Sequence, residues 1–284
     1  MDNPKTPKVN LPYFDYLLHS LAQKDPDVTQ SFGRHVHWGY WSRPTTATLT
    51  NADFARAAER LSQQVCLAGK VAGKQVVLDV GCGFGGTLAL INETQSNMTL
   101  HGLNIDNRQL QRAQTLVKPK PPNTLQFLQG NACALPYPDQ VFDRVLAVEC
   151  IFHFPDRAQF LKEAFRVLKP GGILSISDFT PKKIIAPLMK ITLPKPLDVG
   201  FYGQCRVDTP LHQYHALAKQ MGFTTTTEKN ITDNTLPTYR YLRKIGAQQK
   251  QLHFTALIET LTIELLSRLH LLDYYILAYQ KPKH

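Results

Sequence analysis

A glycine-rich turn with an acidic residue ahead of it is the segment best suited to chemistry. Asp79 lies in an apolar stretch, and Gly81, Gly83 and Gly85 follow on alternate positions. Glycines let a backbone turn tightly and approach a ligand where any Cβ would collide. The alternate spacing differs from the usual placement of the dinucleotide pattern G-x-G-x-x-G, which the segment matches only loosely. We therefore expect a cofactor with a nucleoside part, and a dinucleotide remains the alternative.

Two further residues have side chains that can move a proton. His153 follows an apolar run at 145–149, and because imidazole titrates near neutral pH it is a candidate general base. Asp178 lies near the end of another apolar run, at 173–179. It is a candidate to orient His153, to take a proton itself or to stabilise a cation. The structural alternatives are a buried, hydrogen-bonded histidine and an aspartate that caps a helix or a turn.

A third group of side chains precedes the glycine-rich turn. His35 and His37 would share one face of an extended strand, but no cysteine or carboxylate cluster nearby completes a ligand set, so we expect no metal site. Tyr40 and Trp41 follow them, and the faces of their rings attract cations. Ordinary packing in the core is the alternative for both aromatic residues.

The elements that must position these residues alternate along the chain. Apolar residues recur at helical spacing from 51 to 68, and strands then alternate with helices up to residue 180. The expected strands are 76–80, 99–105, 126–128, 145–149 and 173–179, and the expected helices are 86–92, 108–116 and 157–168. This is the pattern of a parallel sheet. Ligands bind outside the carboxyl ends of such strands, so the residues after them should meet in one crevice.

The alternation lapses beyond residue 180 and resumes with a helix near 211–221, a strand near 224–229, a helix near 252–269 and a strand at 274–279. An interruption this long usually builds something functional, and we interpret it as part of a substrate cap. The prediction is one α/β domain with a Rossmann-like, doubly wound, seven-stranded sheet. Residues 1–50 form a helical N-terminal lid, 51–180 the cofactor-binding core, and 181–284 the cap insertions plus C-terminal strands that complete the same domain.

Composition excludes several classes of protein. The five cysteines are widely spaced, odd in number and without a CxxC pair, which argues against a disulfide framework. No apolar run approaches the roughly 20 residues of a membrane span, and the N-terminus lacks a signal-peptide core, so we expect a cytoplasmic protein. The net charge is +10. Lys182, Lys183, Lys190 and Lys195 share one aliphatic segment, which predicts either a solvated helix face or a surface that meets an anionic substrate or lipid.

The chain from residue 75 to 178 resembles the class I S-adenosylmethionine-dependent methyltransferases, with its motifs in the same order. The resemblance implies S-adenosyl-L-methionine as cofactor and assigns its methionine part to Asp79, Gly81, Gly83 and Gly85. A carboxylate at Asp79 can accept hydrogen bonds from the α-ammonium, while the glycine amides face the cofactor's carboxylate. An Asp79 that only caps the following helix is the alternative.

The resemblance continues at the second and third strands. Asn104 stands where the family often has an acid that bridges the ribose hydroxyls, and an amide lacks that symmetric grip. With Gln109 it forms the Gly-x-Asn-x-x-x-x-Gln pattern of enzymes that methylate macrolides, sterols and isoprenoids. Ile105 would lie against the adenine, or else pack in the core. Asn131 and Ala132 stand where the family binds the adenine edge.

The reaction side resembles small-molecule methyltransferases as well. A histidine in a Glu-x-x-x-His context, here Glu149 and His153, is often their proposed base, and we add Glu149 to the expected cofactor contacts. Tyr40 and Trp41 complete a His-x-Gly-Tyr-Trp motif that closes over cofactor and substrate. Base methyltransferases carry an Asn/Asp-Pro-Pro-aromatic tetrad where this chain has Glu-Cys-Ile-Phe, so we expect no nucleic-acid partner.

The expected acceptor is a small, largely apolar natural product or lipid-like molecule. The aromatic lid and the apolar segments at 184–193 and 254–266 would enclose an apolar pocket. O-methylation with His153 as base is the first hypothesis. C-methylation of an isoprenoid or sterol alkene is the alternative, with Tyr40, Glu149 and Asp178 available to a carbocation. A non-catalytic scaffold that only binds the cofactor is a further alternative.

Overall fold

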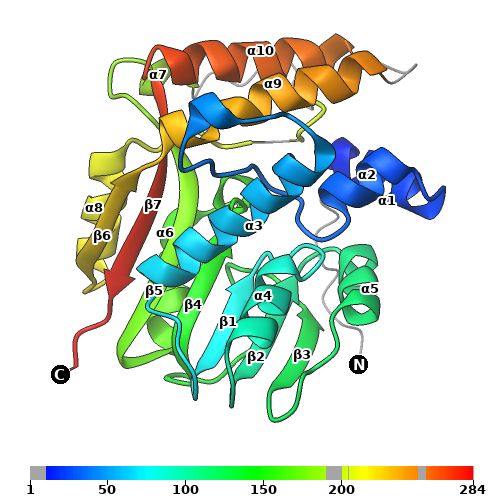
Figure 1. Cartoon of the computed structure of the whole chain (residues 1–284). Coiled ribbons are helices and arrows are strands. Elements are labelled where there is room, and N and C mark those ends of the chain that lie inside the picture. The colour runs from blue at the N-terminus through cyan, green and yellow to red at the C-terminus, as the bar shows by residue number, and fades with distance from the viewer. Residues whose placement is uncertain (1–10, 190–199, 204, 249–253, 284) are drawn as a thin grey trace, which may run out of the picture.

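A seven-stranded sheet is the centre of the computed structural model, which describes residues 11–189, 200–203, 205–248 and 254–283. The strands lie in the order β3-β2-β1-β4-β5-β7-β6 (Figure 1). Their bounds are β1 Val76–Val80, β2 Thr99–Asn104, β3 Thr124–Gln129, β4 Phe142–Val148, β5 Leu168–Pro181, β6 Thr224–Asn230 and β7 Leu272–Gln280. Strands β1 to β5 are parallel, and β7 pairs antiparallel with both β5 and β6. The predicted α/β fold is confirmed.

Helices cover the sheet and extend beyond it. They are α1 Pro12–Ala22, α2 Pro26–Phe32, α3 Asn51–Ala68, α4 Gly86–Thr94, α5 Asn107–Leu116, α6 Arg157–Val167, α7 Ala186–Met189, α8 Leu211–Gln220, α9 Thr232–Gln248 and α10 Phe254–Arg268. In Figure 1, α9 and α10 stack over the end of the sheet where β5 ends and β7 begins. None of the helices in the described ranges is long and apolar enough to cross a membrane.

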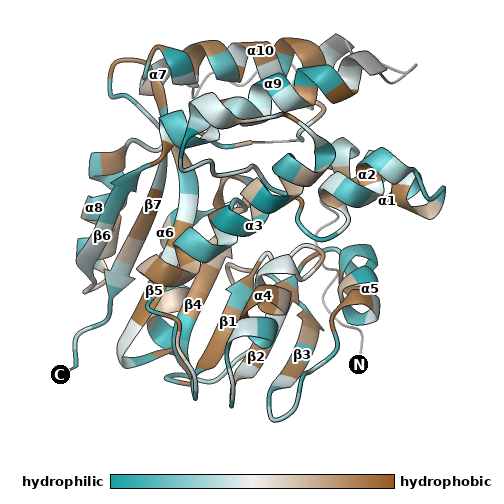
Figure 2. Ribbon diagram, viewed as in Figure 1, coloured by the Kyte–Doolittle hydropathy of each residue, from teal (hydrophilic) through white to brown (hydrophobic). Residues whose placement is uncertain are grey.

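Alternate residues of β1 build the two layers of the core. Val77 packs into the apolar cluster under α3 and α4, whereas Leu78 and Val80 pack into the cluster on the other face, under α6 and α8. Figure 2 shows hydrophobic residues along β1 and β4 in the middle of the sheet. The chain runs from β1 outward to β3 and then returns to β4 on the other side of β1. This switch point leaves a crevice at the carboxyl ends of β1 and β4.

The structure departs from the sequence predictions at two elements. Helix α9 was not predicted. It packs on α10, and the two helices cover one end of the sheet (Figure 1). Strand β5 already begins at Leu168, whereas the strand was expected to begin at residue 173. The register against β4 shifts between Phe142 and Arg144, so the extra residues are accommodated as an irregularity within the strand. The division into lid, core and cap stays a prediction.

Candidate active site

The crevice at the carboxyl ends of the parallel strands holds a cavity of about 380 Å³, which we call the main cavity. Its walls come from the segments after β1, β2, β3 and β4 and from the chain on either side of α1 and α2. Ten of the predicted site residues line it: Asp79, Gly81, Gly83, Asn104, Ile105, Gln109, Asn131, Ala132, Glu149 and His153.

The glycine-rich turn requires glycines, because its backbone angles are positive and its neighbours lie close. Gly81 and Gly83 have positive φ angles of +73° and +54°, and a Cβ on Gly81 would lie 2.7 Å from the Cys150 Sγ atom. Gly85, at φ +79°, is the N-cap of α4. A Cβ there would face Phe127 at 3.1 Å, and Gly85 does not line the main cavity. Gly85 is therefore needed for the turn and for the packing of α4. The predicted contact of Gly85 with a ligand is not supported.

The carboxyl of Asp79 is buried. Its side chain is 2% exposed, and none of the described residues donates a hydrogen bond to it. Burial raises the pKa of Asp79 to about 8. Because α4 is capped by Gly85, Asp79 does not act as its cap. A carboxyl held in this way fits a cationic group of a ligand, such as an α-ammonium.

Two amide side chains in the wall are already oriented by the protein. Asn104 donates from Nδ2 to the Gln109 Oε1 atom at 3.0 Å and accepts at Oδ1 from the backbone N–H of Asp106 at 3.0 Å. Asn131 accepts from the backbone N–H of Cys133 at 2.9 Å. Each amide keeps further donors for a ligand, since its NH₂ group carries two hydrogens.

Glu149 has a left-handed backbone, with φ +51°, directly after β4. The backbone N–H of Trp38 lies 3.0 and 3.1 Å from its two carboxyl oxygens, and the Tyr274 hydroxyl donates to the Oε2 atom. Burial raises the pKa of Glu149 to about 8, although the hydrogen bonds from Tyr274 and Trp38 act in the opposite direction. Non-glycine residues with a left-handed backbone are strained, and such residues are often found at functional sites.

His153 lies in a short helical turn, Ile151–His153, at the border of two cavities. Its Nε2 atom is 3.3 Å from the hydroxyl of Tyr13, whose ring stacks on the imidazole. Burial raises the pKa of Tyr13 well above its ordinary value, so the phenol keeps its hydrogen and can donate it to His153. The sulfur of Cys205 is 4.0 Å from Nδ1. His153 thus lines the main cavity and is oriented by Tyr13 of α1.

A second space of about 130 Å³, which we call the apolar cavity, adjoins the main one. The shared wall is formed by the residues that line both: Tyr13, Val36, His37, Glu149 and His153. The apolar cavity is otherwise lined mainly by aromatic and aliphatic side chains, among them Trp38, Phe152, Phe179, Val207, Leu242 and Ile263. A further cavity of about 140 Å³ continues between α1 and the α9–α10 pair.

The structure places the two predicted aromatic site residues away from the main and the apolar cavities. Trp41 is 2% exposed, and its indole N–H donates to Asp53 at 3.0 Å. Tyr40 has the Lys229 ammonium 5.0 Å from its ring centroid, so its face already holds a cation of the protein. Neither lines the main or the apolar cavity. The packing alternative is therefore favoured, and the expected contact with the cofactor is not supported.

Asp178 also lies outside the linings of these cavities. Its side chain is fully buried, accepts from the Tyr214 hydroxyl and lies 3.4 Å from the Arg157 Nε atom. It lines neither the main nor the apolar cavity. Because both of its partners belong to the protein, on α6 and α8, the arrangement favours the structural alternative over the predicted catalytic role.

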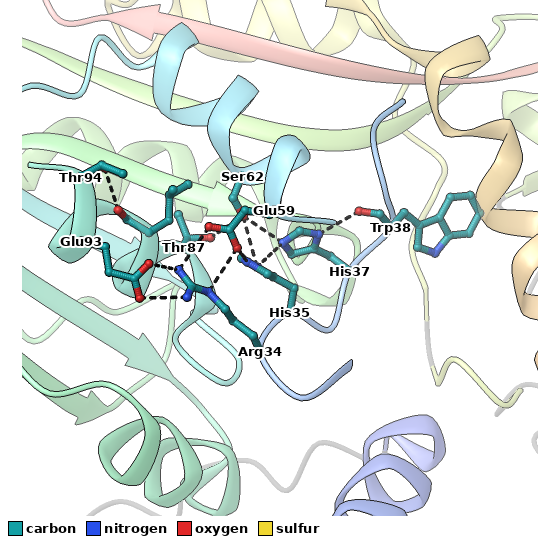
Figure 3. A network of polar contacts seen from close by, with 10 residues as sticks. Arg34, His35, His37, Trp38, Glu59, Ser62, Thr87, Glu93 and Thr94 are labelled. Atoms are coloured by element: carbon teal, nitrogen blue, oxygen red, sulfur yellow. Dashed lines mark hydrogen bonds and ion pairs between the residues drawn. The ribbon is translucent and has the colours of Figure 1, made fainter. Parts of the chain in front are cut away.

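A polar network beside the main cavity was missed by sequence reasoning (Figure 3). His35 and His37, which had been considered only as metal ligands, hydrogen-bond to each other at 3.1 Å. Glu59 on α3 lies 2.6 Å from the His35 Nε2 atom, and Ser62, one turn later, lies 3.0 Å from the His37 Nε2 atom. The spacing of Glu59 and Ser62 on one helix face was a signal in the sequence, but nothing there showed that the two histidines lie opposite.

Comparisons with known proteins show the family of this chain. Residues 78–176 match the model of a family described as a methyltransferase domain. The chain is 32% identical over 213 residues to methyltransferase GfsG of Streptomyces halstedii, which covers 73% of this chain and 72% of that protein. The chain belongs to the class I S-adenosylmethionine-dependent methyltransferases. It is thus an enzyme of that family, and S-adenosyl-L-methionine is its cofactor.

Two other proteins extend the similarity over nearly the whole methyltransferase. Erythromycin 3''-O-methyltransferase of Saccharopolyspora erythraea is 27% identical over 286 residues, covering 94% of this chain and 89% of that one. Among solved structures, the [4+2]-cyclase SpnF has a TM-score of 0.71 at 21% identity, covering 97% and 98% of the two chains. The second similarity shows the fold alone.

Proposed function

We propose that this methyltransferase acts on a small, largely apolar molecule of the natural-product or lipid-like class, and that it methylates a hydroxyl oxygen. The supporting observation is the position of His153 in the wall between the main cavity and the apolar cavity. The names of two relatives also support it, since erythromycin 3''-O-methyltransferase and 27-O-demethylrifamycin SV methyltransferase each name an oxygen of a natural product.

The cofactor would occupy the main cavity. Asp79 would accept hydrogen bonds from its ammonium, and the turn through Gly81 and Gly83 would place backbone N–H groups near its carboxylate. Asn104 and Gln109 would bind the ribose hydroxyls, while the remaining predicted contacts would surround the adenine: Ile105, Asn131 and Ala132. Glu149 would lie near the sulfonium end, because it shares the wall with the apolar cavity.

The acceptor would enter the apolar cavity with its hydroxyl toward His153. When bound, the cofactor supplies a methyl group on a cationic sulfur. As the acceptor oxygen forms its bond to the methyl carbon and the bond from that carbon to sulfur breaks, the His153 imidazole would take the hydroxyl proton, and S-adenosylhomocysteine would be the leaving group. The Tyr13 hydroxyl, 3.3 Å from Nε2, orients the ring. The apolar walls exclude water, and alignment in the cavity contributes much of the rate.

C-methylation of an alkene is a second candidate function, because Glu149 places a carboxyl among aromatic rings. Trp38 and Phe179 line the same cavity and pack edge to face, with ring centroids 4.9 Å apart. Ring faces and a carboxylate both stabilise a carbocation, which alkene methylation produces. The carboxyl is held by Trp38 and Tyr274 and so has a fixed position.

The test is a screen of hydroxylated macrolactones, prenylated phenols and isoprenoid alkenes with S-adenosylmethionine carrying a deuterated methyl group. Mass spectrometry identifies the labelled product, and NMR shows whether the methyl is on oxygen or carbon. A labelled O-methyl product supports the proposal, and a C-methyl product favours the second candidate. Label in none of the acceptor classes would contradict the proposed acceptor.

Contact with a lipid surface stays a prediction for the segment after β5. Lys182 pairs with Asp273 at 2.6 Å, and Ile184 beside it is 82% exposed. Lys190 and Lys195 lie outside the described residues. Flotation with anionic vesicles tests the contact: binding that Ile184→Ser weakens supports it, and absence of the full chain from the vesicle fraction opposes it.

A further inference from the structure

The network around His35 has a protonation pattern that its distances fix. The Nδ1 atom of His37 lies 2.9 Å from the carbonyl oxygen of Trp38 and must carry a hydrogen, because a carbonyl only accepts. Burial, together with the charge of His35, lowers the pKa of His37 to about 3. The His37 ring is therefore neutral, and its Nε2 atom can only accept.

His35 must then donate from both of its nitrogens. Its Nδ1 atom is 3.1 Å from the accepting His37 Nε2 atom, and its Nε2 atom is 2.6 Å from the Glu59 Oε2 atom (Figure 3). Burial raises the pKa of Glu59, but the hydrogen bond and charge of His35 and the charge of Arg34 outweigh it, so the pKa lies below its ordinary value. Glu59 is thus a carboxylate, and His35 carries two ring hydrogens and a positive charge.

Ser62 is compatible with this pattern. Its hydroxyl lies 3.0 Å from the His37 Nε2 atom, 3.4 Å from the His35 Nδ1 atom and 3.0 Å from the Thr87 Oγ1 atom, so it can also accept from His35. The serine can donate its hydrogen to Thr87, which leaves the bond from His35 to His37 in place. A neutral His35 would instead bring a lone pair against either His37 or Glu59.

The charges of the network are placed unevenly around the main cavity. Arg34 pairs with Glu59 and Glu93, so the four charges sum to zero, but only Arg34 and His35 line the cavity. A Cβ on Gly86, the first residue of α4, would lie 2.5 Å from the His35 Nδ1 atom. The imidazolium therefore packs directly on the N-terminal end of α4, where backbone N–H groups also favour an anion.

We propose that Glu59 is a positioning residue that holds His35 as a cation at the start of α4, where the two features together bind the carboxylate of the cofactor's methionine part. The inference rests on the proposed placement of the cofactor in the main cavity. That carboxylate is the only anionic group of S-adenosylmethionine. Asp79, also in the cavity wall, repels an anion and suits the ammonium.

A comparison of two ligands measures how much the contact with the carboxylate contributes to binding. S-adenosylhomocysteine has the carboxylate, whereas 5′-methylthioadenosine has the same adenosine and sulfur without the amino-acid part. In calorimetric titrations, Glu59→Gln and His35→Gln should each lower the affinity for S-adenosylhomocysteine on the order of ten-fold. The affinity for 5′-methylthioadenosine should stay within about two-fold of the wild-type value. Glu93→Gln is the matched control, because it removes an ion pair of Arg34 without touching His35, and both affinities should stay within about two-fold.

A second readout follows the charge itself. Nitrogen-15 NMR of the histidine rings should show two protonated nitrogens on His35 in the wild type and one in Glu59→Gln. Equal weakening of both ligands in Glu59→Gln, unchanged binding of S-adenosylhomocysteine in that variant, or a neutral His35 in the wild type would overturn the proposal. A wild type that binds neither ligand would overturn the cofactor placement itself, and the role of His35 with it.

Discussion

The hydrogen-bonding partner of His153 comes from α1. Tyr13 precedes the glycine-rich turn by more than sixty residues in sequence, yet its hydroxyl is 3.3 Å from the His153 Nε2 atom. The phenol stays protonated because burial raises its pKa. The imidazole nitrogen that faces Tyr13 consequently accepts, and it can take a proton from the acceptor hydroxyl only where that hydroxyl replaces the Tyr13 phenol.

We expect His153→Ala to slow methyl transfer by about 10²-fold if the imidazole takes the acceptor proton. Single-turnover rates measured between pH 6 and 9 should lose their dependence on the protonation of this ring. Tyr13→Phe is the control, since it keeps the ring stack and loses only the hydroxyl, and its effect should be smaller. A His153→Ala rate equal to the wild type at every pH would refute the base role.

At the residue scale, the sequence predicted the residues that line the main cavity better than the buried residues around it. The glycine-rich turn and the Asn104–Gln109 pair both line the cavity, because their spacing is tied to local backbone geometry. Trp41 and Asp178 were misplaced, since the direction of a buried side chain depends on partners that are distant in sequence. The same reason explains why Glu59 was not found.

Asp178 acts at the scale of elements. It joins β5 to α6 and α8 through Arg157 and Tyr214, and all three side chains are buried. Arg157 is further tied to Asp208 at 3.3 Å. The carboxylate thus balances a buried guanidinium, and its loss would leave that charge without its main partner.

Asp178→Ala should lower the free energy of unfolding by about 3–5 kcal/mol, because it leaves the buried Arg157 without its carboxylate partner. Urea unfolding followed by circular dichroism measures the change. Asp139→Ala is the matched control: this aspartate also pairs with an arginine, Arg166, but is 69% exposed, and we expect less than about 1 kcal/mol. Wild-type stability together with lost turnover in Asp178→Ala would restore the catalytic role.

The elements themselves were largely predictable. The strands from β1 to β5 follow from apolar runs and intervening helical periodicity, which local chemistry determines. Helix α9 was missed because its sequence contains Pro237 and mixes polar with aromatic residues. Its stability depends on packing against α10, which no local pattern reports.

At the scale of the whole molecule, the cavities lie between α1, the carboxyl ends of the parallel strands and the α9–α10 pair. Two carboxyls, Asp79 and Glu149, line the main cavity, and burial raises the pKa of each to about 8 from ordinary values of 3.8 and 4.5. Without cofactor both carboxyls therefore stay largely protonated at neutral pH. The cationic ammonium and sulfonium of a bound cofactor would favour their ionised forms.

Without cofactor, stability should therefore fall as the pH rises from 6.5 to 8. In this window the folded protein keeps two protons that the unfolded chain has released, so the unfolded state binds fewer protons and gains from rising pH. The slope should reach at most about 1.4 kcal/mol per pH unit for each carboxyl. His37, with its pKa lowered to about 3 from 6.5, acts in the opposite direction, mainly at pH 6.5 and below, where the unfolded chain binds a proton that the folded protein does not. Urea unfolding at several pH values measures the slope.

The control for this slope is the double variant Asp79→Asn with Glu149→Gln, which removes both ionisable groups and keeps their shapes. Its stability should be nearly independent of pH across the window. A wild type whose stability rises between pH 6.5 and 8 would show that the two carboxyls are not held protonated in the folded state.

The central claim is that the main cavity binds S-adenosylmethionine through Asp79, and calorimetric titration with S-adenosylhomocysteine tests it most directly. We predict micromolar binding by the wild type, at least about ten-fold weaker binding by Asp79→Asn, and no binding of NAD by either. Equal affinities of wild type and Asp79→Asn, or binding of NAD in place of S-adenosylhomocysteine, would contradict the account.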